Sequence, residues 1–473
     1  MAGTLVDKLW DLHAVADLGD GTSLLYIDRI FLHERTGSVA LQGLAAAGRT
    51  VRNPEQVFCT MDHIVDTFPG RGDATRMPGG TEFITATRAA ARAAGINLFD
   101  LGDDRQGIVH VVSPEQGIAL PGVTLVCPDS HTCTLGGLGA LAWGIGSTDG
   151  EHALATKTLA VRKPKLMRVT FRGRLAPGVY AKDLILHLIH QHGADGGSGY
   201  AVEFAGEAIA ALGVEARLTL CNMAVEFGAF TGIVAPDERT IEYVRGRPYA
   251  PQGADWDRAV DHWRTLRSDP DAVFDRELEV DCSTLAPQVT WGTSPQHGSG
   301  VDGTVPDPAA EADANRRSAM ERALAYMDLA AGTPLAGLPI AAAFIGSCTN
   351  SRISDLREAA RVLRGHHVAP GVKAICVPGS STVKRAAEAE GLDAVFRAAG
   401  FEWRESGCSM CFFAGGESFG LEERVITSTN RNFENRQGPR TRSHLASPAT
   451  VAASAIAGRI SDPRPLLAPA IPE

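Results

Sequence analysis

The sequence predicts an α/β protein of about three domains, in which helices cover mixed, largely parallel sheets. Short apolar runs recur along the chain, and turn residues and helical patterns follow them. This alternation is typical of parallel sheets. The length of 473 residues is too great for a single hydrophobic core, and 51 glycines suit many tight strand-to-helix turns. The runs predicted as strands are residues 109–112, 123–126, 166–171, 340–345, 372–377 and 425–428.

Glycine and proline positions divide the chain into predicted domains at residues 1–165, 166–304 and 305–473. The segment 295–311 is rich in both residue types and predicts a linker or a long surface loop. A second, less distinct domain boundary is predicted at Lys163-Pro164-Lys165, after a glycine-rich segment.

Composition excludes several classes of protein. The net charge is −10 and the pI is near 5.8, so no basic face is expected for nucleic acid. Charge at Asp7 and Lys8 precedes any apolar run, which is unlike a secretory signal. The most apolar stretch, 135–145, is interrupted by glycines and falls short of the roughly 18 residues of a membrane helix. We therefore expect a cytoplasmic enzyme that binds neither membranes nor nucleic acid.

Three cysteines form the strongest candidate metal site. Cys348 lies in Phe-Ile-Gly-Ser-Cys-Thr-Asn-Ser-Arg, and Cys408 and Cys411 form Gly-Cys-Ser-Met-Cys. The nine cysteines are an odd number in a long chain, which favours reduced thiols over a disulfide framework. A pair spaced C-x₂-C alone fits a zinc knuckle, a redox pair or a cluster loop. A closed zinc site needs a fourth ligand, whereas a [4Fe–4S] cluster on three cysteines leaves one iron open.

Polar runs follow several apolar strands: Met61-Asp62-His63, then His110, then Asp129-Ser130-His131. Active sites of α/β proteins gather at such strand ends. An aspartate beside a histidine can orient it and keep it protonated, which suits donation of a proton to a departing hydroxyl. Each run taken alone also fits an ordinary structural histidine.

Two further groups of residues suggest anion binding. Asn430, Arg431 and Arg436 share a loop after a strand, and arginine forks match carboxylates. A surface ion-pair cluster is the alternative. Asn222 and Glu226 are four residues apart and share one face if their segment is helical, although an ordinary exposed pair has the same spacing.

Together these motifs resemble the aconitase superfamily over about residues 4–458. Segments such as Leu-Ala-Pro-Gln-Val-Thr-Trp-Gly-Thr-Ser-Pro narrow the resemblance to large subunits of 3-isopropylmalate dehydratases. The resemblance implies three aconitase-type α/β domains around a central cluster cleft, and a [4Fe–4S] cluster with one open iron, held by Cys348, Cys408 and Cys411. It implies an acid–base shell of Asp62, His63, His110, Asp129, Ser130, His131 and Glu226. Substrate-binding residues are implied at Asn222, Asn430, Arg431 and Arg436.

The implied reaction converts 2-isopropylmalate to 3-isopropylmalate in leucine biosynthesis, by loss and return of water. Single-chain aconitases carry a further swivelling domain, for which too few residues follow the last motif here. We therefore expect that domain to be absent and supplied by a separate small subunit. The expected ligand is a small di- or tricarboxylate.

Departures from the family pattern leave the substrate open. Pro128 and Asn435 stand where glycine is usual, Phe-Phe-Ala-Gly at 412–415 replaces Leu-Ala-Met-Asn, and the segment 36–39 lacks the usual Ser-Pro-Gln. One alternative is a paralogous isomerase acting on another malate, such as homocitrate, dimethylmalate or a phosphinyl analogue. Two others are a non-catalytic iron sensor that binds RNA, which the charge disfavours, and a zinc-bound interaction protein.

Overall fold

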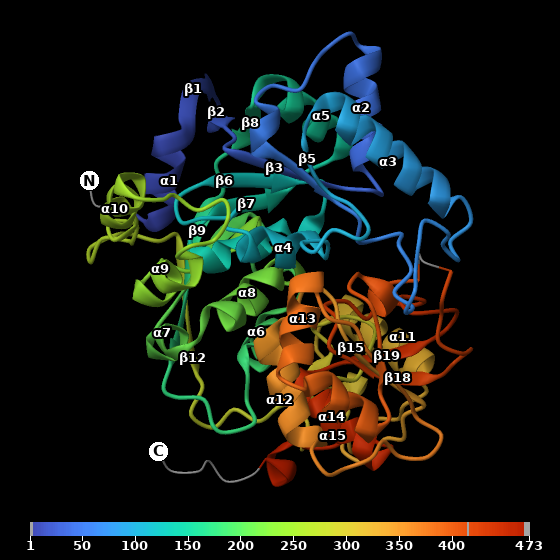
Figure 1. The fold of residues 1–473 in the computed structure, drawn as a ribbon. Coiled ribbons are helices and arrows are strands. Elements are labelled where there is room, and N and C mark those ends of the chain that lie inside the picture. Colours follow the sequence, from blue (N-terminus) through green and yellow to red (C-terminus); the bar gives the residue numbers. More distant parts are fainter. Residues whose placement is uncertain (1–2, 414–415, 468–473) are drawn as a thin grey trace.

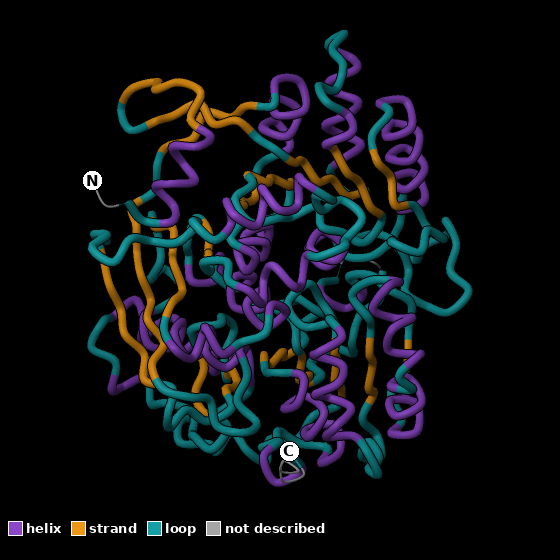
Figure 2. Tube along the Cα trace, turned by 60° about the vertical axis from the view of Figure 1, so that its left-hand side comes forward, coloured by secondary structure: helices purple, strands orange, loops and turns teal. Residues whose placement is uncertain are grey.

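A computed structural model describes residues 3–413 and 416–467, and within these ranges three parallel sheets are flanked by helices (Figure 1). In Figure 2 the strands of these sheets form separate groups with helices around them. The expected α/β class with largely parallel sheets is thereby confirmed. In the described ranges, no helix combines the length and the apolar character needed to cross a bilayer.

The first sheet has five parallel strands with β3 in the middle. Their spatial order is β5 (Asn97–Phe99), β4 (Val57–Thr60), β3 (Arg29–His33), β6 (Thr124–Cys127) and β7 (Leu141–Gly144). The associated helices are α2 (Gly37–Ala46), α3 (Gly80–Ala94), α4 (Val109–Glu115) and α5 (Ser147–Thr156). Strands β4 and β6 are buried throughout, as expected for parallel strands covered on both faces.

The second sheet is also parallel, and it uses the middle of the chain. Its order is β11 (Thr231–Ile233), β10 (Tyr200–Ala205), β9 (Lys165–Arg172) and β12 (Arg276–Asp281). Its helices are α6 (Ala181–His192), α7 (Glu207–Ala211), α8 (Val214–Asn222), α9 (Glu238–Val244) and α10 (Ala254–Trp263).

The third sheet repeats the layout of the first, with β15 in the middle. Its order is β17 (Glu402–Trp403), β16 (Lys373–Cys376), β15 (Ala342–Ile345), β18 (Arg424–Thr427) and β19 (Arg442–Leu445). Its helices are α11 (Ala314–Met327), α12 (Ile353–Leu363), α13 (Ser381–Ala389), α14 (Leu392–Ala399) and α15 (Pro448–Ala457). In Figure 1 these elements occupy the lower right, below the first sheet.

Smaller antiparallel elements complete the described fold. Helix α1 (Leu5–His13) precedes a sheet of β1 (Ala14–Gly19), β2 (Thr22–Tyr26) and β8 (Thr158–Arg162). Strands β13 (Gln288–Thr290) and β14 (Gly298–Gly300) pair with each other, and of the two only β14 lies within the segment 295–311 predicted as a linker or a long surface loop.

The strand predicted at 109–112 is wrong, because these residues begin helix α4. A short buried apolar run does not distinguish a strand from a helix. The helix is favoured by tertiary contacts: the carboxylate of Asp62 accepts a hydrogen bond from the amide of Val109 at 3.0 Å. This contact satisfies one of the unpaired N–H groups at the start of the helix.

The domain boundaries near residues 165 and 305 stay a proposal. Each large sheet is built within one of the predicted segments. One apolar cluster nevertheless crosses the first boundary, since it joins Leu138 and Leu141 to Leu218 and Ile233. The first two segments therefore share a core.

Backbone contact between the first two segments leaves no room for a side chain at Gly136. Gly136 lies in the 3-10 helix Ser130–Leu138, and its carbonyl accepts a hydrogen bond from the amide of Val234 at 2.9 Å. A β-carbon at position 136 would lie 1.8 Å from the carbonyl oxygen of Gly232.

We predict that Gly136→Ala destabilises the protein by at least about 1–3 kcal/mol, the cost of overpacking a dense contact. The measurement is the midpoint of thermal unfolding, which should fall by several degrees. Gly72→Ala is the matched control, since a β-carbon there meets nothing within 4 Å. Equal midpoints for the two variants would contradict the described packing.

A second prediction concerns pH. Glu115 is buried and its carboxylate accepts a hydrogen bond from Ser380 Oγ at 2.7 Å; burial raises its pKa to about 7. Because an exposed glutamate has a pKa of about 4.3, the folded protein holds a proton that the unfolded chain releases. The stabilising contribution is complete below about pH 4.3 and is lost as pH rises through about 7.

Glu115→Gln removes this titration but keeps an acceptor for Ser380. The stability of the variant relative to the unchanged protein should therefore increase between pH 5 and pH 8, measured by urea unfolding across that range. A difference that is constant with pH would rule out a raised pKa for Glu115.

Candidate active site

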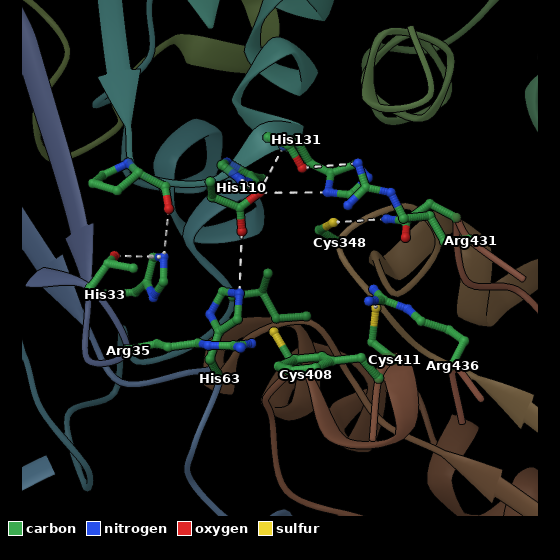
Figure 3. Close-up of a pocket in the computed structure, with 17 residues that line it drawn as sticks. His33, Arg35, His63, His110, His131, Cys348, Cys408, Cys411, Arg431 and Arg436 are labelled. Carbon is green, nitrogen blue, oxygen red and sulfur yellow. Dashed lines mark hydrogen bonds and ion pairs between the residues drawn. The ribbon is translucent and has the colours of Figure 1, made fainter. Parts of the chain in front are cut away.

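A cavity of about 290 Å³ opens where strand ends of the first and third sheets meet (Figure 3). In both sheets the strand that comes first in the sequence lies in the middle, and the later strands are added first on one side of it and then on the other. Such switch points leave a crevice beyond the carboxyl ends of the strands, where α/β proteins bind ligands. The lining residues are His33, Arg35, Thr36, His63, Ile108, His110, Pro128, Asp129, Ser130, His131, Cys348, Cys408, Cys411, Phe412, Asn430, Arg431 and Arg436.

Every site residue predicted from the sequence lines this cavity except Asp62, Asn222 and Glu226. These three lie behind the lining and contact it: Asp62 bonds His63, Asn222 bonds Cys348, and Glu226 pairs with His131 and Arg431. Asn222 and Glu226 do not share a helix face, because α8 ends at Asn222 and Glu226 lies in the 3-10 helix Val225–Phe227.

The three candidate thiols enter the cavity from two loops of the third sheet. Cys348 follows β15 and precedes α12, while Cys408 and Cys411 follow β17, at the 3-10 helix Ser409–Cys411. All nine cysteines are unpaired and buried. Ser347 and Ser409, each next to a cavity cysteine, have φ of 82° and 45°. Non-glycine residues held in this region are strained and cluster at functional sites.

Nitrogen donors surround the sulfur atoms. Asn222 and Asn430 each direct Nδ2 at Cys348 Sγ, at 3.2 and 3.4 Å, and a guanidinium nitrogen of Arg436 lies 3.7 Å from Cys411 Sγ. Burial, followed by the neighbouring Cys411, raises the pKa of Cys348 to about 12. Buried thiolates in such a group need a cation to compensate their charge. The donor set therefore fits a metal centre bound by thiolates.

Asp129 is the hub of the acid–base residues. Its carboxylate lies 3.2 Å from His63 Nε2, 3.3 Å from His110 Nε2 and 3.5 Å from His131 Nδ1. Burial alone would raise its pKa, but the three imidazoles reverse this and hold the pKa well below the ordinary value. Conversely, burial would lower the pKa of His63, and nearby carboxylates, Asp62 first, raise it well above its usual range. An imidazolium at His63 is thus stabilised.

His110 differs from the other histidines around this hub. Its Nε2 lies close to Asp129, yet within the described residues neither ring nitrogen makes a well-aligned hydrogen bond. A buried imidazole facing a cavity in this way has its hydrogen-bonding capacity available for a ligand.

Glu226 joins the two halves of the site. Its Oε1 lies 3.0 Å from His131 Nε2 and 2.6 Å from Arg431 Nε, and Arg431 also donates to Ser130 Oγ at 3.0 Å. Burial would raise the pKa of Glu226, but His131 and Arg431 more than offset it and lower the pKa. Arg431 is therefore already neutralised by a protein carboxylate.

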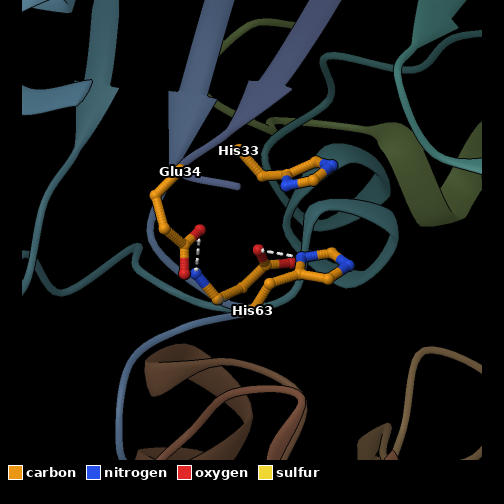
Figure 4. Close-up of side chains that lie close together, drawn as sticks. His33, Glu34 and His63 are labelled. Carbon is orange, nitrogen blue, oxygen red and sulfur yellow. Dashed lines mark hydrogen bonds and ion pairs between the residues drawn. The ribbon is translucent and has the colours of Figure 1, made fainter. Parts of the chain in front are cut away.

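Sequence reasoning missed His33, the last residue of β3, and Glu34 and Arg35, which follow it (Figure 4 labels His33, Glu34 and His63). The signal was available, because a polar run after an apolar strand is the pattern that identified Asp62 and Asp129. Glu34 accepts hydrogen bonds from the amides of Asp62, at 2.9 Å, and Ile64. The ring of His33 stacks on that of His63 with centroids 4.1 Å apart.

The side chains of His33, Glu34, Asp62 and His63 bring possible ligand atoms within 4.8 Å of one another. Both oxygens of Glu34 are occupied by backbone amides, and those of Asp62 by His63 and the amide of Val109. We therefore interpret this group as a hydrogen-bonded support for the His63 loop.

Three of the departures from the family pattern reach the cavity wall, through Thr36, Pro128 and Phe412. Asn435 adopts φ of 64°, the left-handed conformation for which glycine is usual and asparagine is tolerated. Phe413 is largely exposed, whereas Ala414 and Gly415 lie outside the described residues.

Comparison with known proteins agrees with the family resemblance of the sequence motifs. The model of the aconitase family (aconitate hydratase) matches residues 7–458. "3-Isopropylmalate dehydratase large subunit 1" of Bradyrhizobium diazoefficiens is 58% identical over 461 residues, covering 98% of this chain and 96% of that protein.

Among solved structures, the holo-form of Thermococcus kodakaraensis aconitase X aligns over 92% of this chain and 91% of its own, with 14% identity and a TM-score of 0.46. The family match spans nearly the whole chain. The chain therefore belongs to the aconitase family, and hydro-lyase chemistry is the class of activity that goes with it.

Proposed function

We propose that this chain is the large subunit of a 3-isopropylmalate dehydratase, which removes water from 2-isopropylmalate and returns it at the neighbouring carbon. The observation that carries the proposal is the meeting of three thiols and a network of carboxylates and histidines in one cavity. The identity of 58% to a protein of that name supports the choice of substrate.

A [4Fe–4S] cluster is typical of the family, and we propose Cys348, Cys408 and Cys411 as its ligands. The residues present fit such a cluster. Of the cysteines in the described residues, these three line the cavity, and side-chain nitrogens of asparagine and arginine face two of their sulfur atoms. Fewer ligands than irons leave one iron open, and when bound the cluster supplies a Lewis acid for a substrate oxygen.

The protein's own groups move the proton and hold the anion. His110 lines the cavity and is the proposed donor to the departing hydroxyl, while Asp129 and His63 keep negative and positive charge beside it. These residues, with Asp62, Ser130, His131 and Glu226, form the proposed acid–base shell. Asn222, Asn430, Arg431 and Arg436 form the proposed cluster-side and carboxylate-binding groups, with Asn222 acting through Cys348.

A separate small subunit is part of the proposal. The related Bradyrhizobium protein is named a large subunit. We infer that the partner covers the cavity and contributes the base that removes the substrate proton. It also contributes contacts to the alkyl group.

A second candidate is isomerisation of another 2-alkylmalate. It is favoured by the placement of Pro128 and Phe412 in the cavity wall, because wall residues set which substituent fits. Parallel assays with 2-isopropylmalate and dimethylmalate on one preparation separate the two candidates.

The primary test is anaerobic reconstitution with iron and sulfide in the presence of the small subunit, followed by ultraviolet detection of the unsaturated intermediate. We predict that Cys408→Ser abolishes both the cluster absorption and the intermediate, because one ligand is lost. Cys282→Ser, a cysteine outside the cavity, is the control and should keep both. A full complement of iron and sulfide in Cys408→Ser would refute the proposed ligand set.

Glu226→Gln tests the acid–base shell separately from the cluster. Loss of the charge frees Arg431 and removes the anionic partner of His131, so kcat should fall about 10²-fold or more. Iron and sulfide content should stay unchanged. The control is Glu238→Gln, which removes an exposed ion pair with Arg264. A kcat equal to that of the control would exclude Glu226 from the shell.

A further inference from the structure

Arg35 brings a guanidinium to the cavity, and no described residue of opposite charge pairs with it. It lines the cavity, and in Figure 3 it extends from the side of His33 toward His63 and Cys408. Its side chain makes no ion pair or hydrogen bond within residues 3–413 and 416–467, and its guanidinium lies over the ring of Phe412. Arg35 belongs to the polar run at the end of strand β3, which the sequence analysis did not single out.

The other cavity arginines differ in how they are neutralised. Arg431 is paired with Glu226 at 2.6 Å. Arg436 has no carboxylate partner in the described ranges, and its Nε is buried without a hydrogen bond. Among the described residues, Arg35 and Arg436 are thus the lining arginines without a carboxylate partner, although a guanidinium nitrogen of Arg436 also lies 3.7 Å from Cys411 Sγ. Guanidinium forks match carboxylates bidentately, and hydrogen bonds between such charged partners are stronger than neutral ones.

One aromatic ring lies against both of these guanidiniums. Arg35 Cζ is 5.1 Å and Arg436 Cζ is 5.2 Å from the centroid of Phe412, and the ring of His63 is 5.8 Å away. The electron-rich ring attracts cations, and its stiffness limits where long side chains can rest. The amide of Phe413 donates to the carbonyl of Arg436 at 2.7 Å, which ties the Phe412 segment to the arginine loop.

We propose that Arg35 and Arg436 form a guanidinium clamp that binds a carboxylate of the substrate, and that Phe412 is the positioning residue that holds both guanidiniums at the cavity. The ligand class is a small molecule with at least two carboxylates. The clamp rests on the proposed function, because it assigns one carboxylate of that substrate. It adds Arg35 to the binding residues and gives a role to Phe412, a departure from the family pattern.

The test uses the reconstituted complex with its small subunit at saturation. Arg35→Gln should raise KM for 2-isopropylmalate at least about tenfold while kcat changes less than about threefold, as expected for loss of a charged hydrogen bond to bound substrate. Arg35→Lys should recover only part of the loss, since lysine lacks the planar fork. The thermal midpoint should not change, because Arg35 is exposed.

Phe412 is tested by Phe412→Leu, which keeps apolar volume but removes the ring. It should raise KM severalfold, and Phe412→Tyr should restore the original value. Phe413→Leu is the matched control, because that neighbouring ring is 47% exposed and does not line the cavity. A KM in Phe412→Leu equal to that of the control would overturn the positioning role.

Other outcomes are equally decisive. An unchanged KM in Arg35→Gln, with an active unmodified complex, would overturn the clamp while leaving the proposed function intact. Weaker affinity for the small subunit with unchanged KM would assign Arg35 to the subunit interface and also overturn it. An inactive unmodified complex would count against the proposed function alone. Calorimetric titration with succinate, which cannot react, would still test the clamp and should give about tenfold weaker binding in Arg35→Gln.

Discussion

Backbone hydrogen bonds between the first and third sheets hold the two sides of the site in register. The amide of Cys408 donates to the carbonyl of Asp62 at 2.8 Å, and the amide of Ile108 donates to the carbonyl of Gly379 at 2.8 Å. Gly107 permits this approach, since a β-carbon there would lie 2.4 Å from Ser380 Cα. Because these contacts are between main-chain atoms, they fix loop positions whatever the neighbouring side chains are. A thiol loop and an acid–base loop thereby become one site.

The charges of the site are stable only as a connected group. Burial disfavours each isolated carboxylate, imidazolium and thiolate, but opposite charges a few ångströms apart reverse the preference. Asp129 is the clearest case, with a pKa well below its ordinary value although it is buried. Glu34 supports the loop that carries Asp62 and His63, because its carboxylate accepts hydrogen bonds from the backbone amides of Asp62 and Ile64. Removing one member therefore leaves its partners uncompensated rather than merely weakening one contact.

The cavity combines two kinds of wall. Thiols, histidines and carboxylates are interlinked by hydrogen bonds, so a change at one position disturbs several others. Pro128 and Phe412 are apolar members of the lining, and Arg35 has no charged partner within the described ranges. Substitutions at these positions can alter what the cavity accepts without dismantling the network. Such an arrangement lets the chemistry be retained while the choice of malate changes.

The parallel α/β class and the residues of the site could be read from local pattern. Period, glycine turns and polar runs after apolar strands are properties of neighbouring residues, so Cys348, Asp62 and Asp129 could be named as candidates, although each Asp-His run taken alone also fits an ordinary structural histidine. The helix at residues 109–112 could not be predicted, because a short buried apolar run fits a strand as well as a helix. The hydrogen bond from the amide of Val109 to the Asp62 carboxylate favours the helix. His33 to Arg35 carried the same signal as Asp62, but nothing in the sequence indicated that β3 lies between β4 and β6.

What the sequence by itself determined is therefore the set of chemical groups and the strands that carry them, since both depend on local composition. Only the tertiary structure decided which groups meet. The pairing of Glu226 with Arg431, the sharing of Asp129 among three histidines and the placement of Phe412 against two guanidiniums join residues far apart in the chain. Their distances follow from how the three sheets and the loops after their strands are placed relative to one another, which no local pattern encodes.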